Sequence, residues 1–159
     1  MPGTPSSSRS AGLVAPAWVG TADSGLLDVG QGAGNAIGIL AYNPVAFTVT
    51  QIGFRVGVQA GNMILGVYDA AGARLYQEAS FAVPASGAQR RTLTASFSLP
   101  AGPFYIFVQG NNAALSFAMS AGTAAGAAFF FANIFTNGMP ANLPALTETD
   151  DLMALTAIA

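Results

Sequence analysis

The sequence lacks three residue types that carry much of protein chemistry: its 159 residues include no cysteine, no histidine and no lysine. Without cysteine, disulfides and thiolate metal sites are excluded. Without histidine, the commonest general base and the commonest transition-metal ligand are missing. Without lysine, there is neither a Schiff-base nucleophile nor a phosphate-loop lysine. We therefore expect no enzyme activity, no cofactor and no metal site.

Charge of either sign is also scarce. Only 8% of the residues are charged, against about 25% in ordinary soluble domains, and residues 92–147 contain none. The net charge of −2 argues against a nucleic-acid partner, because phosphate binding needs a basic patch. A free domain usually relies on a charged surface for solubility. Either abundant Ser, Thr, Asn and Gln supply that solubility, or much of the surface faces another protein chain, which is the interpretation we favour.

Alternating apolar and polar residues dominate what is present, and they predict strands. In residues 92–99, leucine, alanine and phenylalanine alternate with threonine and serine, as in a half-buried antiparallel strand. Residues 104–109 are apolar on both faces, which predicts a central strand. About seven such runs are separated by turn signals at even spacing, and no amphipathic helix stands out. We predict an all-β protein, an antiparallel β-sandwich that is jelly-roll-like.

The apolar parity changes within one of these runs. Val49 lies at an odd position of the pattern, whereas Ile52 and Phe54 lie at even positions. Since side chains alternate with period two along a strand, a parity change means an inserted residue. We predict a β-bulge or a strand break at Thr50 and Gln51, and expect the strand to pass there from one sheet to the other.

The sequence divides into an extended N-terminal arm with its lead-in, residues 1–34, and a single sandwich domain, residues 35–159. The first ten residues have too little apolar surface to fold alone, so they must lie either on their own domain or on a neighbouring subunit, and we favour the neighbouring subunit. Trp18, the only tryptophan, fits a core plug at the domain edge or an interface anchor. The candidate partner-contact residues are Arg9, Leu13, Val14 and Trp18.

Asp69 and a cluster of three acids, Glu148, Asp150 and Asp151, are candidates for a chemical role. Asp69 begins a pattern that ends in Gly72, which is typical of a type I turn, so we expect Asp69 to cap its own turn. Glu148, Asp150 and Asp151 could offer oxygen ligands to Ca²⁺, but they lack the alternate spacing and the glycine of an EF-hand loop. We predict a solvated turn before the last strand instead.

Residues 122–135 contain two glycines four apart and then Phe129, Phe130 and Phe131. This pattern raises the alternative of a membrane span with a small-residue contact face. Polar residues within the window and the lack of Lys or Arg flanks argue against it. We expect no membrane association, and predict a strand near residues 128–135 that buries at least two of the three rings.

The central region resembles a known group of modules. The elements are Ile64-Leu65-Gly66-Val67-Tyr68-Asp69-Ala70-Ala71-Gly72 and Leu99-Pro100-Ala101-Gly102-Pro103-Phe104-Tyr105. They resemble small β-sandwich modules of bacteriophage virion proteins, which occur in head fibres, capsid decoration proteins and tail-fibre tips. The resemblance implies a homotrimer or another symmetric assembly on the virion and no enzyme, and it passes on no catalytic residue.

Two functions follow from these observations. The first is a structural protein of the phage particle surface, a capsid decoration, cement or head-fibre protein whose partners include the major capsid protein. The second is a tail-fibre or tail-tip adhesin that binds host glycans, with Trp18, Tyr42, Asn111 and Asn112 as candidate contacts. Decoration ranks first because the chain has room for only an arm and one sandwich.

Overall fold

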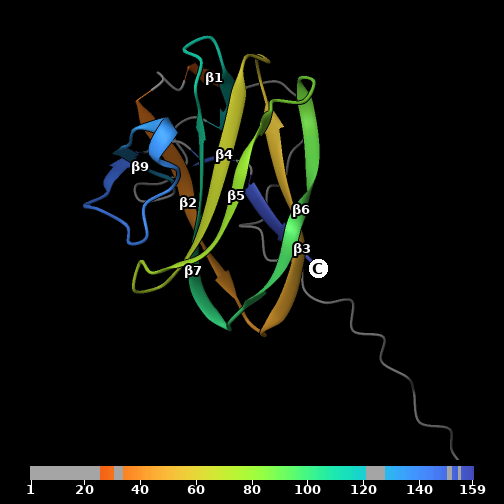
Figure 1. Ribbon diagram of the computed structural model, residues 1–159, viewed down its shortest axis with the longest axis vertical. Coiled ribbons are helices and arrows are strands. Elements are labelled where there is room, and N and C mark those ends of the chain that lie inside the picture. The colour runs from red at the N-terminus through yellow and green to blue at the C-terminus, as the bar shows by residue number, and fades with distance from the viewer. Residues whose placement is uncertain (1–25, 31–33, 121–127, 150–151, 154) are drawn as a thin grey trace, which may run out of the picture.

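The computed structural model describes residues 26–30, 34–120, 128–149, 152–153 and 155–159. These residues form two antiparallel six-stranded sheets that pack face to face (Figure 1). Sheet A contains β1 (Leu26–Gly30), β3 (Phe47–Val56), β6 (Gly87–Leu99), β8 (Ser116–Ser120), β11 (Leu152–Met153) and β12 (Leu155–Ile158). Sheet B contains β2 (Asn35–Asn43), β4 (Asn62–Asp69), β5 (Arg74–Ala82), β7 (Gly102–Gly110), β9 (Ala128–Ala132) and β10 (Thr147–Thr149). The predicted antiparallel β-sandwich is confirmed.

Sheet B has the strand order β10-β9-β2-β7-β4-β5, so β7 lies well inside the sheet. Its side chains are covered on both faces, as the apolar run at 104–109 predicts. Phe104, Ile106 and Val108 belong to the core between the sheets. Phe107 belongs to a second cluster on the outer face of sheet B. Leu65 and Val67 of the neighbouring strand β4 also point into the inner core.

The outer cluster is covered by the chain itself. Residues 133–146, which include the short 3-10 helix η1 (Phe135–Asn137), pack Met139, Phe135, Leu143 and Leu146 against this face of sheet B. Phe129 and Phe131 of β9 are buried there and Phe130 is half-buried, which confirms the prediction for the three rings. Within the described part of the chain, no helix has the length and apolar character needed to cross a membrane.

The irregularity predicted near Gln51 is present. Val49 of β3 pairs with Phe97 of β6, but Gln51 pairs with Thr92, so the register shifts between these two pairs. Thr50 therefore stands opposite residues 93–96 of β6. The prediction that the strand changes sheets here is wrong, because β3 pairs with β6 on both sides of the shift. The extra residues of β6 form a bulge that absorbs the shift, so β3 stays in sheet A.

Two other segments differ from their expected setting. Within the stretch predicted as arm and lead-in, residues 26–30 form β1, which pairs with β8 in sheet A. Glu148, expected in a turn, lies in β10 and pairs with Phe129. This pairing satisfies the edge of β9, which would otherwise expose unpaired backbone groups. Asp150 and Asp151 lie outside the described residues.

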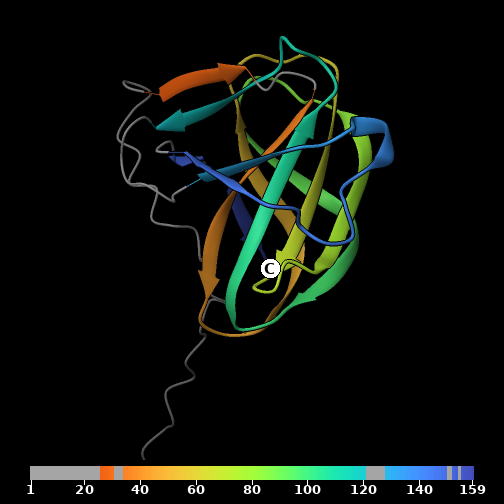
Figure 2. The ribbon, with the colours of Figure 1, turned by 90° about the vertical axis from the view of Figure 1, so that its left-hand side faces the viewer.

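The turns gather at the two ends of the sandwich. The β2–β3 turn and the β6–β7 turn lie together at the lower end in Figure 1, and the β3–β4 turn lies at the upper end. β1 is found near that upper end as well, as the rotated view in Figure 2 shows. The two ends differ in the side chains that they expose.

Candidate functional site

Glu78 is the charged side chain that the described part of the fold buries most completely, with no exposed surface. It lies on β5, the edge strand of sheet B. Its carboxylate faces β6, which belongs to sheet A, across the flank where the two sheets meet. A buried carboxylate in such a position is the strongest candidate in this fold for acid–base chemistry, because active sites often hold ionisable groups in this way.

Five donor atoms surround the Glu78 carboxylate. Arg91 donates from Nε at 3.2 Å and from Nη2 at 2.8 Å to the same oxygen, Oε1. Thr94 donates from its backbone amide to Oε2 at 2.9 Å and from its hydroxyl to Oε1 at 2.7 Å. The Tyr76 hydroxyl donates to Oε2. The lone pairs of both oxygens are therefore engaged by protein groups.

These bonds satisfy the β6 bulge. The register of β3 and β6 gives Thr94 and Ala95 no β3 partner. The Thr94 amide instead donates to Glu78, and the Ala95 amide donates to the Tyr76 hydroxyl at 3.4 Å. Side chains of β5 thus accept hydrogen bonds from two backbone amides of a strand in the other sheet.

Aromatic rings frame the same flank. Tyr76 stacks on Phe97 of β6, with ring centroids 4.9 Å apart and planes 10° from parallel. The guanidinium of Arg91 lies 4.4 Å from the ring centroid of Phe81, in the geometry of a cation–π contact. The charge of Arg91 is therefore shared between a carboxylate and an aromatic face, and both hold β5 against β6.

The environment keeps Glu78 ionised. Burial by itself would raise the pKa of this carboxyl, but the hydrogen bonds from Tyr76, Thr94 and Arg91 outweigh it and lower the pKa to about 2. Burial raises the pKa of Tyr76, and its bond to Glu78 raises it further. The pair therefore consists of a carboxylate and a neutral phenol near neutral pH. We interpret the cluster as a cross-link between the sheets.

Sequence reasoning missed this cluster. The partners of Glu78 are distant in sequence, because Arg91 and Thr94 lie on another strand, 13 and 16 residues away. The only available signal was the presence of an acid in a run with Leu75 and Phe81, whose side chains pack against the core.

Asp69 behaves as the sequence predicts. Its Oδ1 accepts hydrogen bonds from the amides of Ala71 and Ala73, each at 2.9 Å. The Gly72 amide donates to the Asp69 carbonyl at 3.0 Å, and Gly72 has a φ of +84°, which favours glycine. Asp69 is thus engaged by its own turn.

Arg74 is engaged by the segment that covers sheet B. Its Nη1 donates to Oε1 of Gln77 at 2.6 Å and to the carbonyl of Met139. The nearby Tyr68 hydroxyl donates to the Pro140 carbonyl at 3.0 Å. Burial raises the pKa of Tyr68 to about 12, although the charge of Arg74 opposes the shift.

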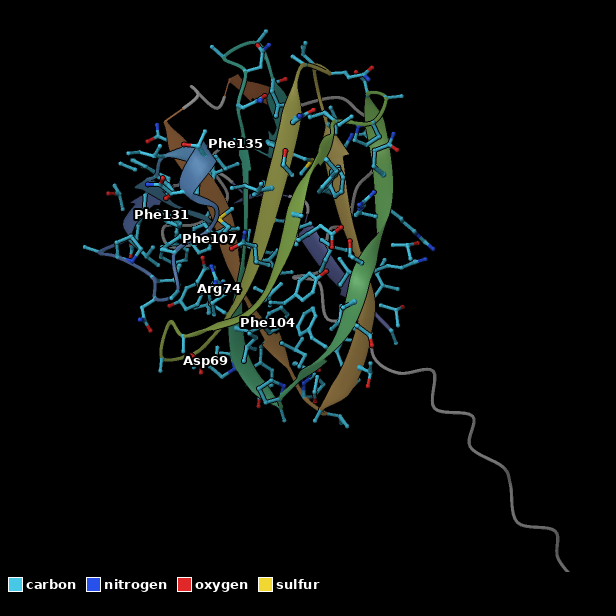
Figure 3. The ribbon with its side chains drawn as sticks, viewed as in Figure 1. Asp69, Arg74, Phe104, Phe107, Phe131 and Phe135 are labelled. Atoms are coloured by element: carbon cyan, nitrogen blue, oxygen red, sulfur yellow. The ribbon has the colours of Figure 1, made fainter. Side chains whose placement is uncertain are left out.

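Figure 3 shows Arg74 below Phe107, Phe131 and Phe135, and Asp69 at the turn beyond it. The rings of Phe107 and Phe131 meet edge-to-face at 4.9 Å between centroids. Two hydrogen bonds fix the same covering segment. The buried Gln109 donates from Nε2 to the Asn133 backbone carbonyl at 2.9 Å, and Asn133 donates from Nδ2 to Gln109 Oε1 at 2.7 Å. These polar groups hold the segment in place.

A different surface is left uncovered at the lower end of the sandwich. Leu40 and Tyr42 point outward from β2, with 39% and 60% of their surface exposed, and Val45 in the next turn is 64% exposed. Tyr42 is the register partner of Pro103, which is also exposed. We call this surface the apolar end; it consists of Leu40, Tyr42, Pro44, Val45, Pro100 and Pro103.

The two turns of the apolar end are fastened to each other. Asn43 is buried, and its Nδ2 donates to the Pro100 carbonyl at 3.1 Å. Asn43 also pairs in register with Gly102. The two turns that carry these apolar side chains are therefore joined by a hydrogen bond and by strand pairing, which lowers the cost of ordering them in a contact.

The predicted contact residues fall in different places. Arg9, Leu13, Val14 and Trp18 lie outside the described residues. Tyr42 belongs to the apolar end. Asn111 and Asn112 lie at the opposite end, where Asn111 Oδ1 accepts from the Asn62 amide at 2.8 Å and Asn112 Oδ1 accepts from the Ala114 amide at 2.9 Å. The structure therefore does not bring Tyr42 and the two asparagines together.

In the described ranges, no group of three or more His, Cys, Asp or Glu side chains could hold a metal ion. Comparison with protein-family models, with curated proteins and with solved structures found no match to this chain. The function proposed below therefore rests on the residues of this chain and on the contacts described above.

Proposed function

We propose that this chain is a structural protein of a bacteriophage virion, a capsid decoration, cement or head-fibre protein. It binds the particle surface as a symmetric oligomer, with a trimer favoured, and contacts other virion proteins such as the major capsid protein. The observation that carries this proposal is the apolar end, where Tyr42 and Val45 are 60% and 64% exposed on a rigid base. Contiguous exposed apolar surface is typical of an interaction site.

Charge supports the same function. The uncharged stretch, residues 92–147, includes β7, β8, β9 and the segment 133–146 that packs over sheet B. A surface with so few charges is poorly suited to a free monomer and well suited to permanent contact with other chains. The prominent charged groups Glu78 and Arg74 form internal hydrogen bonds.

The test is to locate the protein on purified particles. Mass spectrometry should find the chain in particles in a fixed copy number, and electron microscopy of labelled protein should show even copies over the head. Particles that lack the chain, or a chain that remains monomeric at high concentration, would contradict the proposal.

The alternative adhesin function rests on Tyr42, whose exposed ring could act as a platform for a sugar. The hydrogen bonds of Asn111 and Asn112 within their turn weaken it. Glycan-array binding that is lost in Tyr42→Ala, together with label confined to the tail, would favour the adhesin over decoration.

A further inference from the structure

We infer that the flank between β5 and β6 is a latched seam: the latch segment, Tyr76–Glu78 of β5, separates from β6 as a local unit while the rest of the sandwich stays folded. The seam is a property of the fold itself and does not depend on the virion function proposed above. The Glu78 cluster then has a role beyond a static cross-link, because its contacts decide whether the seam is open or closed.

β5 and β6 face each other without backbone pairing. Among the described strands, β5 pairs only with β4 in sheet B, and β6 pairs only with β3 in sheet A. The contacts that join β5 to β6 come from side chains. They are the hydrogen bonds of the Glu78 carboxylate, the stack of Tyr76 on Phe97 and the contact of Arg91 with the Phe81 ring. Opening at this flank therefore breaks no backbone ladder between the two strands.

The latch segment is bounded by an irregularity on each side. Its three residues pair in regular register with Leu65–Val67 of β4. The register shifts before Phe81 pairs with Met63, and it shifts again before Arg74 pairs with Tyr68. Each shift places unpaired residues of β5 next to the latch segment, as in a β-bulge. The segment can therefore tilt away from β6 without breaking the pairs that lie beyond the two shifts.

The two ends of β5 are anchored to other parts of the fold. At its start, the Arg74 amide donates to the Ala141 carbonyl of the covering segment at 2.9 Å. Just beyond its other end, the Val83 amide donates to the Gly61 carbonyl at 3.0 Å, and the Val83 carbonyl accepts from Gln59 Nε2 at 2.9 Å. These bonds confine the opening to the middle of the strand.

The amides of Thr94 and Ala95, which we call the reporter amides, measure the opening directly, because their acceptors Glu78 and Tyr76 lie on the latch segment. Ile106 of β7 pairs with strands on both sides and measures unfolding of the whole domain. Native-state hydrogen exchange of the full chain, followed by NMR at rising urea concentrations, compares them. We expect the reporter amides to be roughly tenfold or more less protected than Ile106. Their exchange should depend little on urea, because local opening exposes little surface.

Two arginine variants connect this exchange to the latch. Arg91→Ala leaves the acceptors of both reporter amides in place, but it removes two hydrogen bonds from the Glu78 carboxylate and the contact with the Phe81 ring. It should speed exchange of the reporter amides roughly tenfold at low urea, without a rise in their urea dependence. The matched control is Arg90→Ala at an exposed position of the same strand, which should change their exchange by less than about threefold.

Reporter amides with the protection and the urea dependence of Ile106 would overturn the inference, since the flank would then open only when the whole domain unfolds. Low protection that Arg91→Ala leaves unchanged would also overturn it, because the amides would then exchange without release of the latch. Circular dichroism checks that each variant is folded. If Arg91→Ala is not, Phe81→Leu replaces it, since this variant removes the ring beneath the guanidinium and should also speed exchange of the reporter amides.

Discussion

The flank at Glu78 includes β6 and the apolar end includes Pro100, which directly follows β6, yet the two regions differ in how their side chains are satisfied. At the flank, the amides of Thr94 and Ala95 are satisfied by side chains of β5, and the carboxylate of Glu78 is enclosed. At the apolar end, where β6 runs into Pro100, Tyr42 and Val45 are left exposed. The hydrogen bonds of the flank are completed within one chain, whereas the apolar end leaves large apolar side chains exposed.

This contrast predicts two classes of variant. Changes at the flank should lower the free energy of unfolding with little effect on association. Changes at the apolar end should weaken association with little effect on the stability of the fold. A flank variant that weakens association, or an apolar-end variant that destabilises the fold, would show that the two regions are coupled.

The largest effect is expected from Glu78→Ala. It removes the acceptor of five donor atoms and leaves the Thr94 amide without its partner. Loss of one member of a buried pair costs about 3 kcal/mol, at the low end of the usual range because Arg91 is partly exposed and can turn to water. Urea unfolding measures the change. Ser80→Ala, at an exposed position of the same strand, is the control, and equal values for the two would refute the role of Glu78.

The sequence predicted the fold better than the contacts of Glu78, and the reason is physical. Alternation and turn residues are local, so they located β7, the Asp69 turn and the register shift opposite Thr50. The partners of Glu78 depend on how far the β6 bulge projects toward β5, and no local pattern encodes that distance. The exposure of Tyr42 likewise depends on where residues 133–146 stop covering sheet B.

Neighbouring arginines give a matched test of the same flank. Arg91→Ala removes two hydrogen bonds to Glu78 and the contact with the Phe81 ring, for a loss of about 2 kcal/mol. Arg90→Ala removes the same charge from an exposed position and should cost less than about 0.5 kcal/mol. Thermal unfolding of both variants compares them, and similar losses would mean that net charge matters rather than the contact.

Acid should weaken the flank before the rest of the molecule. The pKa of Glu78 is about 2 in the folded protein, below its usual value of about 4.3. The unfolded chain therefore takes up the proton first, and the contribution is complete above about pH 4.5 and lost as the pH falls toward 2. Unfolding measured across this range should show a slope that Glu78→Gln flattens. An unchanged slope would assign the acid sensitivity to other carboxyls.

The smallest expected effects come from removing one hydroxyl group from each of two tyrosines, Tyr76 and Tyr42. Tyr76→Phe removes the hydroxyl that donates to Glu78 and accepts from the Ala95 amide, so the free energy of unfolding should fall by about 1 kcal/mol. Tyr42→Phe removes a hydroxyl from a side chain that is 60% exposed and should change stability by less than about 0.5 kcal/mol. Urea unfolding below the concentration at which the chain associates measures both. If Tyr42→Phe were as destabilising as Tyr76→Phe, the apolar end would be part of the fold itself and not a surface reserved for another chain.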